Sequence, residues 1–577
     1  MTTVAVLGGG VAGLSAAHEL AERGFAVTVF EGRETFGGKA RSLPVPNSGR
    51  AGRPDLPAEH GFRFFPGFYR HLPDTMARIP CGQSTVADRL VPATRLLLAQ
   101  ADGRAEMIAA TQSPASLDDL QTMIRFAWDF GTRLGIPHTE LAWFLDRVLT
   151  LLTSCDQRRF EQWERQSWWE FVGAEQRSAP FQKFLADGLT RTLVAARGRE
   201  MSARTGGLIL CQLLFDLTRV GGRADRVLDA PTSEAWIDPW VDHLRAEGVV
   251  LRAQCAVAGI TCQGGRVAAV TVQTPVGTEV VTADYYLAAL PVERLRLLIS
   301  NELRIADPGL AKLSRLAVRW MNGMMFYLAR DVPLQHGHVI FADSEWALTA
   351  ISQAQFWPGV DLRARGNGDV AGILSVDISE WDRPGRRTGK VAMSCTPDEI
   401  RGEVWGQLTD HIDDGSLDAS NVVASFLDPA IVFPNPTGAA NLEPLLINTA
   451  NSWFDRPDAV TRIPNFLLAA DFVRTHTDLA TMEGANEAAR RAVNGILAAT
   501  GSTAPPCAVW KLREPLSLMA FRRLDELQWR IGRRRVSSPL RVNEAGALVP
   551  TGPVAKGLLR LSRQWAGRRP TPPVSGP

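Results

Sequence analysis

The sequence lacks several features that mark secreted, metal-binding or membrane-spanning proteins. Its seven cysteines are an odd number and include no Cys-x-x-Cys pair. A disulfide framework, a zinc site and an iron–sulfur cluster are therefore disfavoured, and reduced, mostly buried thiols are expected. No apolar run reaches the ~18 residues of a membrane-spanning helix, and the N-terminus does not resemble a signal peptide. These absences favour a cytoplasmic protein without a metal site.

Positive charge is unevenly distributed and gathers at the C-terminal end. Residues 510–577 carry 14 Lys and Arg against 4 Asp and Glu, a net charge of +10, whereas the whole chain has a net charge of +2. No nucleic-acid-binding module accompanies this charge, so nucleic acid is not expected as a partner. The segments Phe521–Arg530, followed by Arg533–Arg535, and Leu558–Trp565 have the pattern of basic amphipathic helices. Such helices can lie on an anionic membrane, on another subunit or on the protein's own surface, and the sequence leaves all three open.

Three glycines near the N-terminus, Gly8, Gly10 and Gly13, have the spacing Gly-x-Gly-x-x-Gly. They lie between a predicted buried strand, Val4–Leu7, and a predicted amphipathic helix, Leu14–Arg23. In this motif the first glycine permits a tight turn, the second lets the backbone approach a pyrophosphate, and the third lets the helix pack closely on the strand. The context therefore indicates a dinucleotide-binding βαβ unit in a parallel sheet.

The residues after the glycines complete the first half of a cofactor site. Val11 and Ala12 are near the expected start of the helix, where unpaired N–H groups and the helix dipole favour phosphate. Glu31 follows the next predicted strand, Val27–Phe30, and lies 18 residues after Gly13. An acidic residue near this position binds a ribose hydroxyl in dinucleotide-binding folds.

A second glycine turn carries a resemblance to a known family. The segment Phe36–Ser42 reads Phe-Gly-Gly-Lys-Ala-Arg-Ser. Together with the first motif it resembles the long dinucleotide motif of the FAD-dependent amine oxidase and carotenoid desaturase superfamily. The resemblance implies that FAD is the cofactor, and that this turn contacts it through Gly37, Gly38, Lys39, Ala40 and Arg41.

The second half of the motif is near the C-terminal end of the chain. A predicted buried strand over residues 465–470 leads to Asp471, and a predicted helix begins near Met482. This segment resembles the C-terminal FAD-binding motif of the superfamily. The resemblance implies that Asp471 contacts the ribitol–pyrophosphate part of FAD. It also implies that the helix start, with Thr481, Met482 and Glu483, points at the flavin, where the helix dipole would stabilise negative charge.

A third segment, Glu59–Tyr69, indicates a branch of the superfamily. It resembles the Glu-x-Gly-x-His-x-Phe-Phe-Gly-x-Tyr block of plant- and cyanobacterial-type phytoene and ζ-carotene desaturases, with Arg63 where those enzymes have His. The resemblance implies that Glu59, His60 and Arg63 lie close to the flavin, and we expect the catalytic groups among them. Because a guanidinium stays protonated, Arg63 is expected to stabilise reduced flavin or to orient a quinone rather than to act as a base. A salt bridge that props the loop, and a structural histidine at His60, are the alternatives.

The same resemblance implies a fold that combines α/β and α+β architecture. It consists of a Rossmann-type FAD-binding domain of the glutathione-reductase-like type and a discontinuous substrate-binding domain. The FAD-binding domain is expected in residues 1–71, 230–302 and 430–500, and the substrate-binding domain in residues 72–229 and 303–429. Residues 501–577 have no counterpart in the family and are expected to form a basic amphipathic extension. The stretch 72–204 has mainly helical character.

One apolar region could line a tunnel for a hydrophobic substrate or form ordinary core: Trp320, Met324, Met325, Phe326, Trp346, Phe356 and Trp357. The neighbouring stretch Val318–Tyr327 contains no lysine. Amine oxidases of the family commonly place a lysine near flavin N5, so this absence counts against amine oxidation. His336 and His338 have a spacing that metal ligands can adopt, but a pair within a strand or loop is the simpler interpretation.

These observations favour an enzyme, namely an FAD-dependent desaturase or dehydrogenase. Its expected substrate is a hydrophobic, isoprenoid- or lipid-like molecule that gives hydride to flavin N5. One alternative is an amine or amino-acid oxidase of the same superfamily, and another is a flavin-dependent isoprenoid isomerase or dehydroxylase. Oxygen or a quinone is expected to take the electrons, and the basic extension would place the protein at the inner face of a membrane if it binds lipid.

Overall fold

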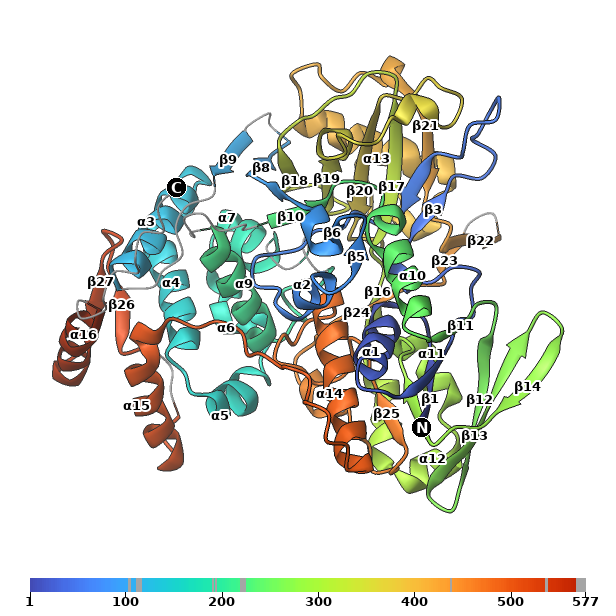
Figure 1. The fold of residues 1–577 in the computed structure, drawn as a ribbon. Coiled ribbons are helices and arrows are strands. Elements are labelled where there is room, and N and C mark those ends of the chain that lie inside the picture. The colour runs from blue at the N-terminus through green and yellow to red at the C-terminus, as the bar shows by residue number, and fades with distance from the viewer. Residues whose placement is uncertain are drawn as a thin grey trace.

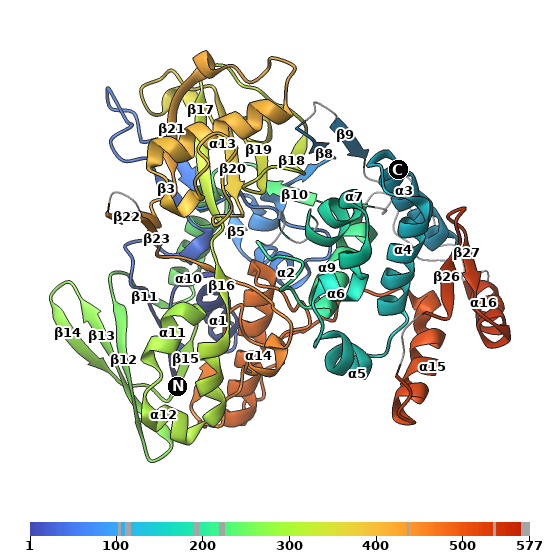
Figure 2. The same cartoon turned by 180° about the vertical axis from the view of Figure 1, so that it is seen from behind.

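The computed structural model describes residues 1–101, 105–109, 117–188, 191, 195–217, 225–435, 438–534 and 538–566. Figures 1 and 2 show three regions around the centre of the molecule. A parallel sheet with its helices forms one region, a larger mixed sheet forms the second, and a group of helices with the C-terminal segment packed on its outer side forms the third.

The parallel sheet has five strands, and all its neighbouring strands run parallel. In spatial order they are β11 (Val250–Arg252), β2 (Ala26–Phe30), β1 (Thr3–Leu7), β15 (Tyr285–Ala288) and β25 (Phe466–Leu468). Its helices are α1 (Val11–Ala21), α10 (Asp238–Ala246), α11 (Val292–Leu298), α12 (Asn301–Ala306) and α14 (Met482–Thr500). The predicted strand–turn–helix–strand unit is confirmed, although α1 begins three residues before the expected Leu14.

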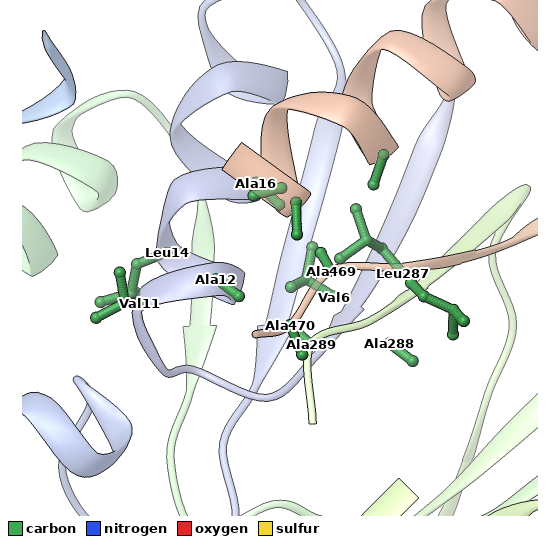
Figure 3. Close-up of a cluster of buried hydrophobic side chains, with 14 of the residues drawn as sticks. Val6, Val11, Ala12, Leu14, Ala16, Leu287, Ala288, Ala289, Ala469 and Ala470 are labelled. Carbon is green, nitrogen blue, oxygen red and sulfur yellow. The ribbon is translucent and has the colours of Figure 1, made fainter. Parts of the chain in front are cut away.

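Small side chains let the helices of this region approach its strands closely. Ala12 and Ala16 of α1 lie beside Val6 of β1, and Ala288 and Ala469 continue the same cluster on the next strands (Figure 3). The helices α1 and α14 lie side by side, and a hydrogen bond of 2.8 Å joins Asn486 Nδ2 to Ser15 Oγ between them. Helix starts from distant parts of the sequence therefore meet at one end of the sheet.

The mixed sheet has seven strands. In spatial order they are β21 (Val422–Leu427), β17 (Asn322–Leu328), β20 (Gly372–Ile378), β19 (Leu348–Ser352), β18 (Gly337–Phe341), β8 (Arg95–Ala99) and β9 (Ala105–Ala109). Only the β8–β18 pair is parallel. Because side chains alternate along a strand, residues such as Leu374 and Val376 of β20 join an apolar core with the helix α13 (Pro397–His411), while Ser375 and Asp377 belong to the opposite face.

The remaining strands form short ladders and one three-stranded sheet. That sheet consists of β12 (Ala256–Gln263), β13 (Arg266–Thr274) and β14 (Gly277–Val281). The ladders are β3 (Ser42–Pro44) with β4 (Pro57–Glu59), β5 (Pro80–Cys81) with β6 (Ser84–Thr85), β7 (Leu90–Ala93) with β10 (Asp225–Leu228), β16 (Val318–Arg319) with β24 (Leu445–Leu446), and β22 (Ile431–Asn435) with β23 (Gly438–Asn441).

The region from residue 72 to 204 is mainly helical only from residue 117 onward. Its first part contains β5 to β9, so the expectation of a mainly helical stretch was wrong there. The helices around it are α2 (His71–Met76), α3 (Leu117–Arg133), α4 (His138–Leu152), α5 (Asp156–Arg158), α6 (Trp168–Val172), α7 (Ala179–Phe181) and α9 (Ala203–Leu217). Short β-ladders were missed because two- to five-residue strands carry too little periodicity to be recognised.

The C-terminal segment packs on the outer side of the helical group (Figures 1 and 2). It contains α15 (Met519–Arg530), β26 (Leu540–Val542), β27 (Leu548–Pro550) and α16 (Pro553–Ala566). Its residues Phe521 and Leu540 share one apolar core with α3 and α4. Of the three surfaces left open by the sequence, the extension therefore contacts the protein's own. Arg535 and residues 567–577 of the predicted extension lie outside the described residues.

Helix α15 is fixed by a buried ion pair. Asp525 Oδ2 lies 3.0 Å from Arg158 Nε and accepts a hydrogen bond of 2.8 Å from the backbone N–H of Cys155. The side chains of Arg158 and Asp525 are 0% and 1% exposed. The guanidinium of Arg158 also lies over the ring of Trp529. No helix in the described part of the chain is long and apolar enough to cross a bilayer. The domain boundaries expected from the resemblance, and the glutathione-reductase-like subtype, stay predictions.

Replacement of Asp525 by alanine should destabilise the protein by about 3–5 kcal/mol, because it leaves the buried Arg158 cation without its partner. The measurement is urea unfolding, followed by tryptophan fluorescence, of Asp525→Ala and the wild type. Because α15 carries the affected contact, limited proteolysis should cleave the variant first within residues 501–566.

The matched control is Glu526→Ala on the same helix. Glu526 pairs with Arg523 and Arg530 on the solvent side. Exposed pairs contribute about 0–1 kcal/mol, so this variant should unfold like the wild type. Equal stability losses in the two variants would contradict the role of the buried pair.

Candidate active site

One large cavity runs from the glycine turns of the parallel sheet to the helical group. Its volume is about 950 Å³. Gly10 and Gly38 line one part, and Phe130 and Phe144 line another. Its size is at the upper end of the range for cofactor and small-molecule sites. The cavity therefore joins the predicted cofactor site to an apolar chamber.

The two glycine turns meet at the cofactor end of the cavity. Gly10 and Gly37 form an isolated parallel bridge, and a Cβ atom on Gly10 would lie 3.7 Å from Cα of Gly38. Gly8 and Gly37 have φ values of +109° and +100°, which side chains rarely tolerate. Gly8, Gly10, Gly37 and Gly38 all line the cavity. Their bare backbone is thus presented to a ligand.

Glu31 and the start of α1 have the arrangement that a dinucleotide requires. The carboxylate of Glu31 accepts hydrogen bonds from the backbone N–H groups of Gly9 (2.8 Å) and Arg33 (2.9 Å), and it lines the cavity. Val11 and Ala12 line the cavity as well. No side chain caps α1, so its first N–H groups are available to an anion.

Lys39 and Arg41 in the second turn both have acidic partners. Lys39 Nζ lies 3.1 Å from Glu293 Oε1, and Arg41 Nη2 lies 3.2 Å from Glu443 Oε1. Lys39 and Ala40 line the cavity, whereas Arg41 does not. Arg41 therefore joins the turn to the segment before β24, and its predicted cofactor contact remains a prediction.

Asp471, Thr481 and Met482 also line the cavity. The hydroxyl of Thr481 accepts a hydrogen bond of 3.1 Å from the N–H of Gly484 and so caps α14. The start of α14 therefore faces the same cavity as the start of α1, as the resemblance implies. Two helix N-termini at one cavity suit a ligand with several negative groups.

The side chain of Glu483, unlike those of Thr481 and Met482, does not face the cavity. Its carboxylate accepts hydrogen bonds from the backbone N–H groups of Arg70, His71 and Leu72, at 2.7–2.9 Å, and lies 2.7 Å from Nδ1 of His71. It does not line the cavity. In the structure Glu483 caps α2 and ties it to α14, rather than facing the ligand space.

Gly13 also lies outside the cavity, and it acts through packing. A Cβ atom at this position would lie 1.9 Å from the carbonyl oxygen of Gly8. The third glycine of the motif therefore allows α1 to press against the first turn, as the motif predicts.

The predicted catalytic residues Glu59, His60 and Arg63 occupy three different environments. Glu59 is buried outside the cavity and accepts hydrogen bonds from Ser42 Oγ and the N–H of Thr232, both at 2.9 Å. Burial raises the pKa of its carboxyl group. Glu59 therefore holds the loop in place rather than facing a substrate.

His60 and Arg63 both line the cavity. His60 Nδ1 lies 2.5 Å from Asp428 Oδ2. Burial alone would raise the pKa of Asp428, but His60 holds it below its usual value. Arg63 donates to the carbonyl of Gly61 at 2.6 Å and to that of Lys39. The Arg63 guanidinium therefore links the Glu59–Tyr69 block to the cofactor turn.

The mixed sheet supplies polar residues that the sequence analysis did not assign to the active site, although it named His338 as half of a histidine pair. His338 of β18, Thr349 of β19 and Asp377 of β20 lie on three adjacent strands, and all line the cavity. The strand register places Thr349 directly beside Asp377, with Gly323 on its other side. The available signal was the charged Asp377 within the otherwise uncharged run Gly372–Ile378, because a buried charge rarely occurs without a purpose.

Asp377 is a buried carboxylate with an unsatisfied oxygen. It is 5% exposed, and its Oδ1 has no hydrogen-bond partner among the described residues. A Cβ atom on Gly61 would lie 2.5 Å from this oxygen, so the loop backbone packs directly on the carboxylate. Burial raises the pKa of Asp377 to about 7, although Arg63 and the N–H of Phe62 favour the ionised form.

His338 is oriented by a carboxylate. Its Nδ1 lies 2.5 Å from Asp225 Oδ2, and its ring packs against Phe62 and Phe64. The buried Nε2 has no partner in the described part of the chain. No group of three or more His, Cys, Asp or Glu resembles a metal site among those residues. His338 is thus a strand residue paired with aspartate, and His336 contacts Thr94.

The apolar end of the cavity is formed by helices. Its walls include Phe126 and Phe130 of α3, Phe144 and Leu145 of α4, and Leu210 and Leu213 of α9. None of the seven residues considered for a tunnel in the sequence analysis lines the cavity. They form core instead, as Met324, Phe326 and Trp346 do around the mixed sheet. The alternative of ordinary core was therefore the correct one for that region.

These residues fit FAD. Two bare glycine turns and two uncovered helix starts face one cavity, and Glu31 lies beside the first turn. Such groups would hold a pyrophosphate and a ribose. The adjoining polar cluster of Arg63, His338 and Asp377 and the apolar chamber leave room for a second, hydrophobic molecule.

Replacement of Gly13 by alanine should weaken FAD binding roughly tenfold or more and cost about 1–3 kcal/mol of stability, because the added methyl forces α1 away from Gly8. Flavin content after purification and a fluorescence titration of the apoprotein with FAD measure the first effect. Thermal unfolding measures the second.

Gly402→Ala in α13 is the matched control, because a Cβ atom there meets nothing within 4 Å. This variant should bind FAD normally and be more stable by about 0.5–1 kcal/mol. Normal FAD binding by the Gly13→Ala variant would contradict the assigned role of the third glycine.

Asp377→Asn should change how stability depends on pH. An unfolded aspartate titrates near about 4, so between about pH 4 and pH 7 the folded wild type keeps a proton that the unfolded chain has lost. The free energy of unfolding of the wild type should therefore fall as the pH rises through this interval. Asparagine cannot ionise, so the variant should gain on the order of 1–4 kcal/mol relative to the wild type across it, measured by urea unfolding.

Asp343→Asn provides a control of opposite sign. Burial opposes ionisation of Asp343, but His411 and Lys183 hold its pKa below the usual value. This aspartate therefore stabilises the fold once it is ionised, and its replacement should cost stability at neutral pH. Parallel pH curves for Asp377→Asn and the wild type would contradict the burial of an ionisable group at that position.

Comparison with known proteins supports the interpretation of the cavity as an FAD site. The model of the family described as flavin containing amine oxidoreductase matches residues 11–354. The chain is 23% identical over 518 residues to the 15-cis-phytoene desaturase of Synechococcus elongatus, with 86% of this chain and 96% of that protein covered. It is 24% identical over 365 residues to the carotenoid phi-ring synthase of Chlorobaculum tepidum. This second match covers 56% of the chain and only 55% of the relative's length.

Solved structures share the fold at low sequence identity. Cyclohexylamine oxidase from Brevibacterium oxydans superposes with a TM-score of 0.56 and 13% identity, over 87% of this chain and 99% of that one. Putrescine oxidase bound to putrescine gives a TM-score of 0.56 and 11% identity, over 86% and 99%. The fold, the glycine turns and the family match agree: the chain belongs to the flavin-containing amine oxidoreductases, and its cofactor is FAD.

Proposed function

We propose that the protein is an FAD-dependent desaturase or dehydrogenase of a hydrophobic, isoprenoid- or lipid-like molecule. The observation that carries this proposal is the continuity of the cavity, which leads from the cofactor turns into a chamber walled by phenylalanine and leucine. An apolar chamber of this kind gains free energy by burying an apolar ligand and offers few hydrogen bonds to a polar one.

The residues of the chain would divide the work between holding the cofactor and orienting the substrate. The starts of α1 and α14 and the carboxylate of Glu31 would bind the phosphate and ribose groups. The aromatic walls would exclude water and hold the substrate chain next to the flavin. When bound, the flavin supplies a hydride acceptor at N5.

Arg63 is suited to stabilise negative charge at the junction of the two parts. Two of its nitrogens are occupied by the carbonyl groups of Gly61 and Lys39, and its buried Nε has no partner in the described residues. The guanidinium is therefore held by the backbone, and its Nε–H is left to donate to another group. A fixed cation beside a reduced flavin or a quinone would act without reorganising.

Two further observations support the proposal of a desaturase. The Glu59–Tyr69 block forms part of the cavity wall through His60, Phe62 and Arg63, so the segment that resembles carotenoid desaturases is at the site. Among the lysines that the structure describes, only Lys39 lines the cavity, and it pairs with Glu293 in the cofactor turn. Amine oxidases of the family commonly place a lysine near flavin N5, and the described mixed sheet contributes no lysine to the cavity.

A second candidate is oxidation of an amine. The carboxylates of Asp225 and Asp377 line the cavity and could pair with an ammonium group. Redox-neutral isomerisation or dehydroxylation of an isoprenoid is a third outcome. It would proceed without any electron acceptor.

The test is an anaerobic spectrum of the FAD-loaded protein with saturated and partly unsaturated isoprenoids and, separately, with amines. An isoprenoid should bleach the flavin band at roughly 450 nm. Re-admission of oxygen or addition of a quinone should restore the band, and the faster of the two identifies the acceptor.

Bleaching by amines alone, with release of peroxide in air, would overturn the desaturase proposal. Product formation from an isoprenoid without acceptor or bleaching would favour the redox-neutral reaction. The Leu210→Trp variant narrows the apolar chamber without touching the cofactor turns, so it should bind FAD normally and lose isoprenoid-dependent bleaching.

We also propose that the C-terminal segment contacts anionic lipid. Leu527 and Ile531 at the end of α15 are 59% and 70% exposed, and Arg523 and Arg530 accompany them at the surface. Apolar side chains beside cations on one helix face are suited to the boundary of an anionic membrane. A membrane-bound enzyme could take a lipid-like substrate directly from the bilayer.

Flotation with phosphatidylserine vesicles tests this contact. The wild type should float, and Leu527→Glu combined with Ile531→Glu should abolish flotation. Val276→Glu is the control, since Val276 is even more exposed, at 98%, but lies in the distant turn between β13 and β14. Wild-type protein that stays at the bottom of the gradient would rule out the contact.

A further inference from the structure

The cavity contains ionisable groups that cofactor binding does not require. Asp377 and His338 are 5% and 7% exposed, both line the cavity, and each has one polar atom without a partner in the described residues: Oδ1 of Asp377 and Nε2 of His338. Leaving a buried polar atom unpaired costs free energy. Such atoms are expected where a reacting molecule completes the hydrogen bonding.

The sheet itself brings the two residues together. They stand on β18 and β20, on the face opposite the apolar core with α13, with β19 between the two strands. Asp377 lies beside Thr349 of β19, and His338 lies beside Ile351, two residues further along the same strand. A protonated His338 favours the ionised form of Asp377. Strand residues are held more rigidly than loop residues, so the pair is preorganised.

Asp225 fixes the imidazole of His338. With Nδ1 turned to the Asp225 carboxylate at 2.5 Å, the unpartnered Nε2 is the nitrogen left for a proton from another molecule. A histidine held in this way by an aspartate is a common arrangement for a general base. The ring is also clamped between Phe62 and Phe64, which belong to the same block as Arg63.

We propose that Asp377 and His338 form the proton-accepting pair of the active site, and that Asp225 is the positioning residue for His338. This inference rests on the proposed desaturation. One substrate C–H bond gives up its hydrogen with both electrons as hydride, for which FAD is the oxidant. The neighbouring C–H bond gives its proton to the pair, and the electrons of that second bond form the new C=C bond.

The surrounding charges agree with this role. Arg63 and His338 favour the carboxylate form of Asp377, and Asp428 together with burial favours the protonated form. Asp428 itself is paired with His60. Burial raises the pKa of Asp377 to about 7 in the absence of substrate, which is close to the value at which a base accepts and returns protons efficiently.

The first test needs no substrate. In FAD-loaded protein labelled with ¹³C at histidine Cε1, the His338 resonance is assigned by its loss in His338→Gln and followed against pH. Ionisation of Asp377 near pH 7 should shift the His338 resonance, and this step should be absent in Asp377→Asn. Asp225→Asn, which removes the carboxylate beside Nδ1, should change the His338 resonance as well. His411 is the internal control, because it pairs with the separate Asp343 and should not respond. A His338 resonance with the same pH dependence in Asp377→Asn and the wild type would overturn the pair.

The second test follows anaerobic bleaching by the isoprenoid that reduces the wild-type flavin. Asp377→Asn and His338→Gln should bind this isoprenoid with unchanged affinity, measured by the shift of the flavin spectrum, and bleach about 10²–10⁴-fold more slowly. Asp225→Asn should move the pH at which the bleaching rate falls. Ser375→Ala, on the same face of β20 and outside the cavity, should behave as the wild type.

The possible results separate the two proposals. Affinity and bleaching rate that fall by the same factor in Asp377→Asn would show an anchor for a polar substrate group and overturn the proton-accepting role. If no isoprenoid bleaches the wild type, the proposed desaturation fails, and the histidine titration alone still decides whether the pair exists. Flavin content and thermal unfolding of each variant show that it is folded.

Discussion

The contact between Gly13 and the carbonyl of Gly8 sets the geometry on which the site depends. A single methyl group at Gly13 would overlap this oxygen, so α1 can reach its position only with glycine there. With α1 in place, its first N–H groups face the cavity and Gly10 meets the turn of Gly37. Small residues also keep the neighbouring elements close together: Ala288 ends β15 and Ala469 follows β25 (Figure 3). This close packing brings the start of α14 to the same place.

The mixed sheet forms the neighbouring part of the cavity, because successive side chains along its strands point to opposite faces. One face of β17 to β20 is apolar and packs on α13, and the other face presents His338, Thr349 and Asp377. The Glu59–Tyr69 block lies between the two sheets. It packs on Asp377 through Gly61 and contacts the cofactor turn through Arg63. A charged cluster thus stands between a phosphate-binding end and an apolar end, where a reacting carbon and a flavin would meet.

Local motifs predicted the cofactor half of the site, because its residues act through backbone geometry that short segments determine. Gly8, Gly10, Glu31, Gly37 and Gly38 all lie where the strand–turn–helix pattern places them. The direction of a side chain is harder to predict. Glu483 follows directly after two cavity residues, yet its carboxylate turns away to cap α2, and nothing in the sequence indicates the position of that helix.

The substrate half depended on long-range pairing and was largely missed. Asp225 and Asp377 are more than a hundred and fifty residues apart in the sequence. His338 and Asp377 belong to the mixed sheet, whereas Asp225 lies in the separate ladder of β7 and β10, so only the tertiary fold brings the three residues to one cavity. The chamber walls likewise come from α3, α4 and α9, whose apolar faces resemble those of ordinary core helices. Composition could identify an apolar region, but the region chosen from the sequence proved to be the core behind the sheet.

The central claim is that a flavin and a hydrophobic molecule share one continuous cavity and meet at Asp377 and His338. The most direct measurement is an experimental structure of the protein with FAD and a long-chain isoprenoid. The account predicts that the flavin ring lies where the Gly37–Lys39 turn meets β18 to β20, with the isoprenoid extending between α3, α4 and α9. A flavin ring remote from Asp377, or a chamber that closes when FAD binds, would contradict it.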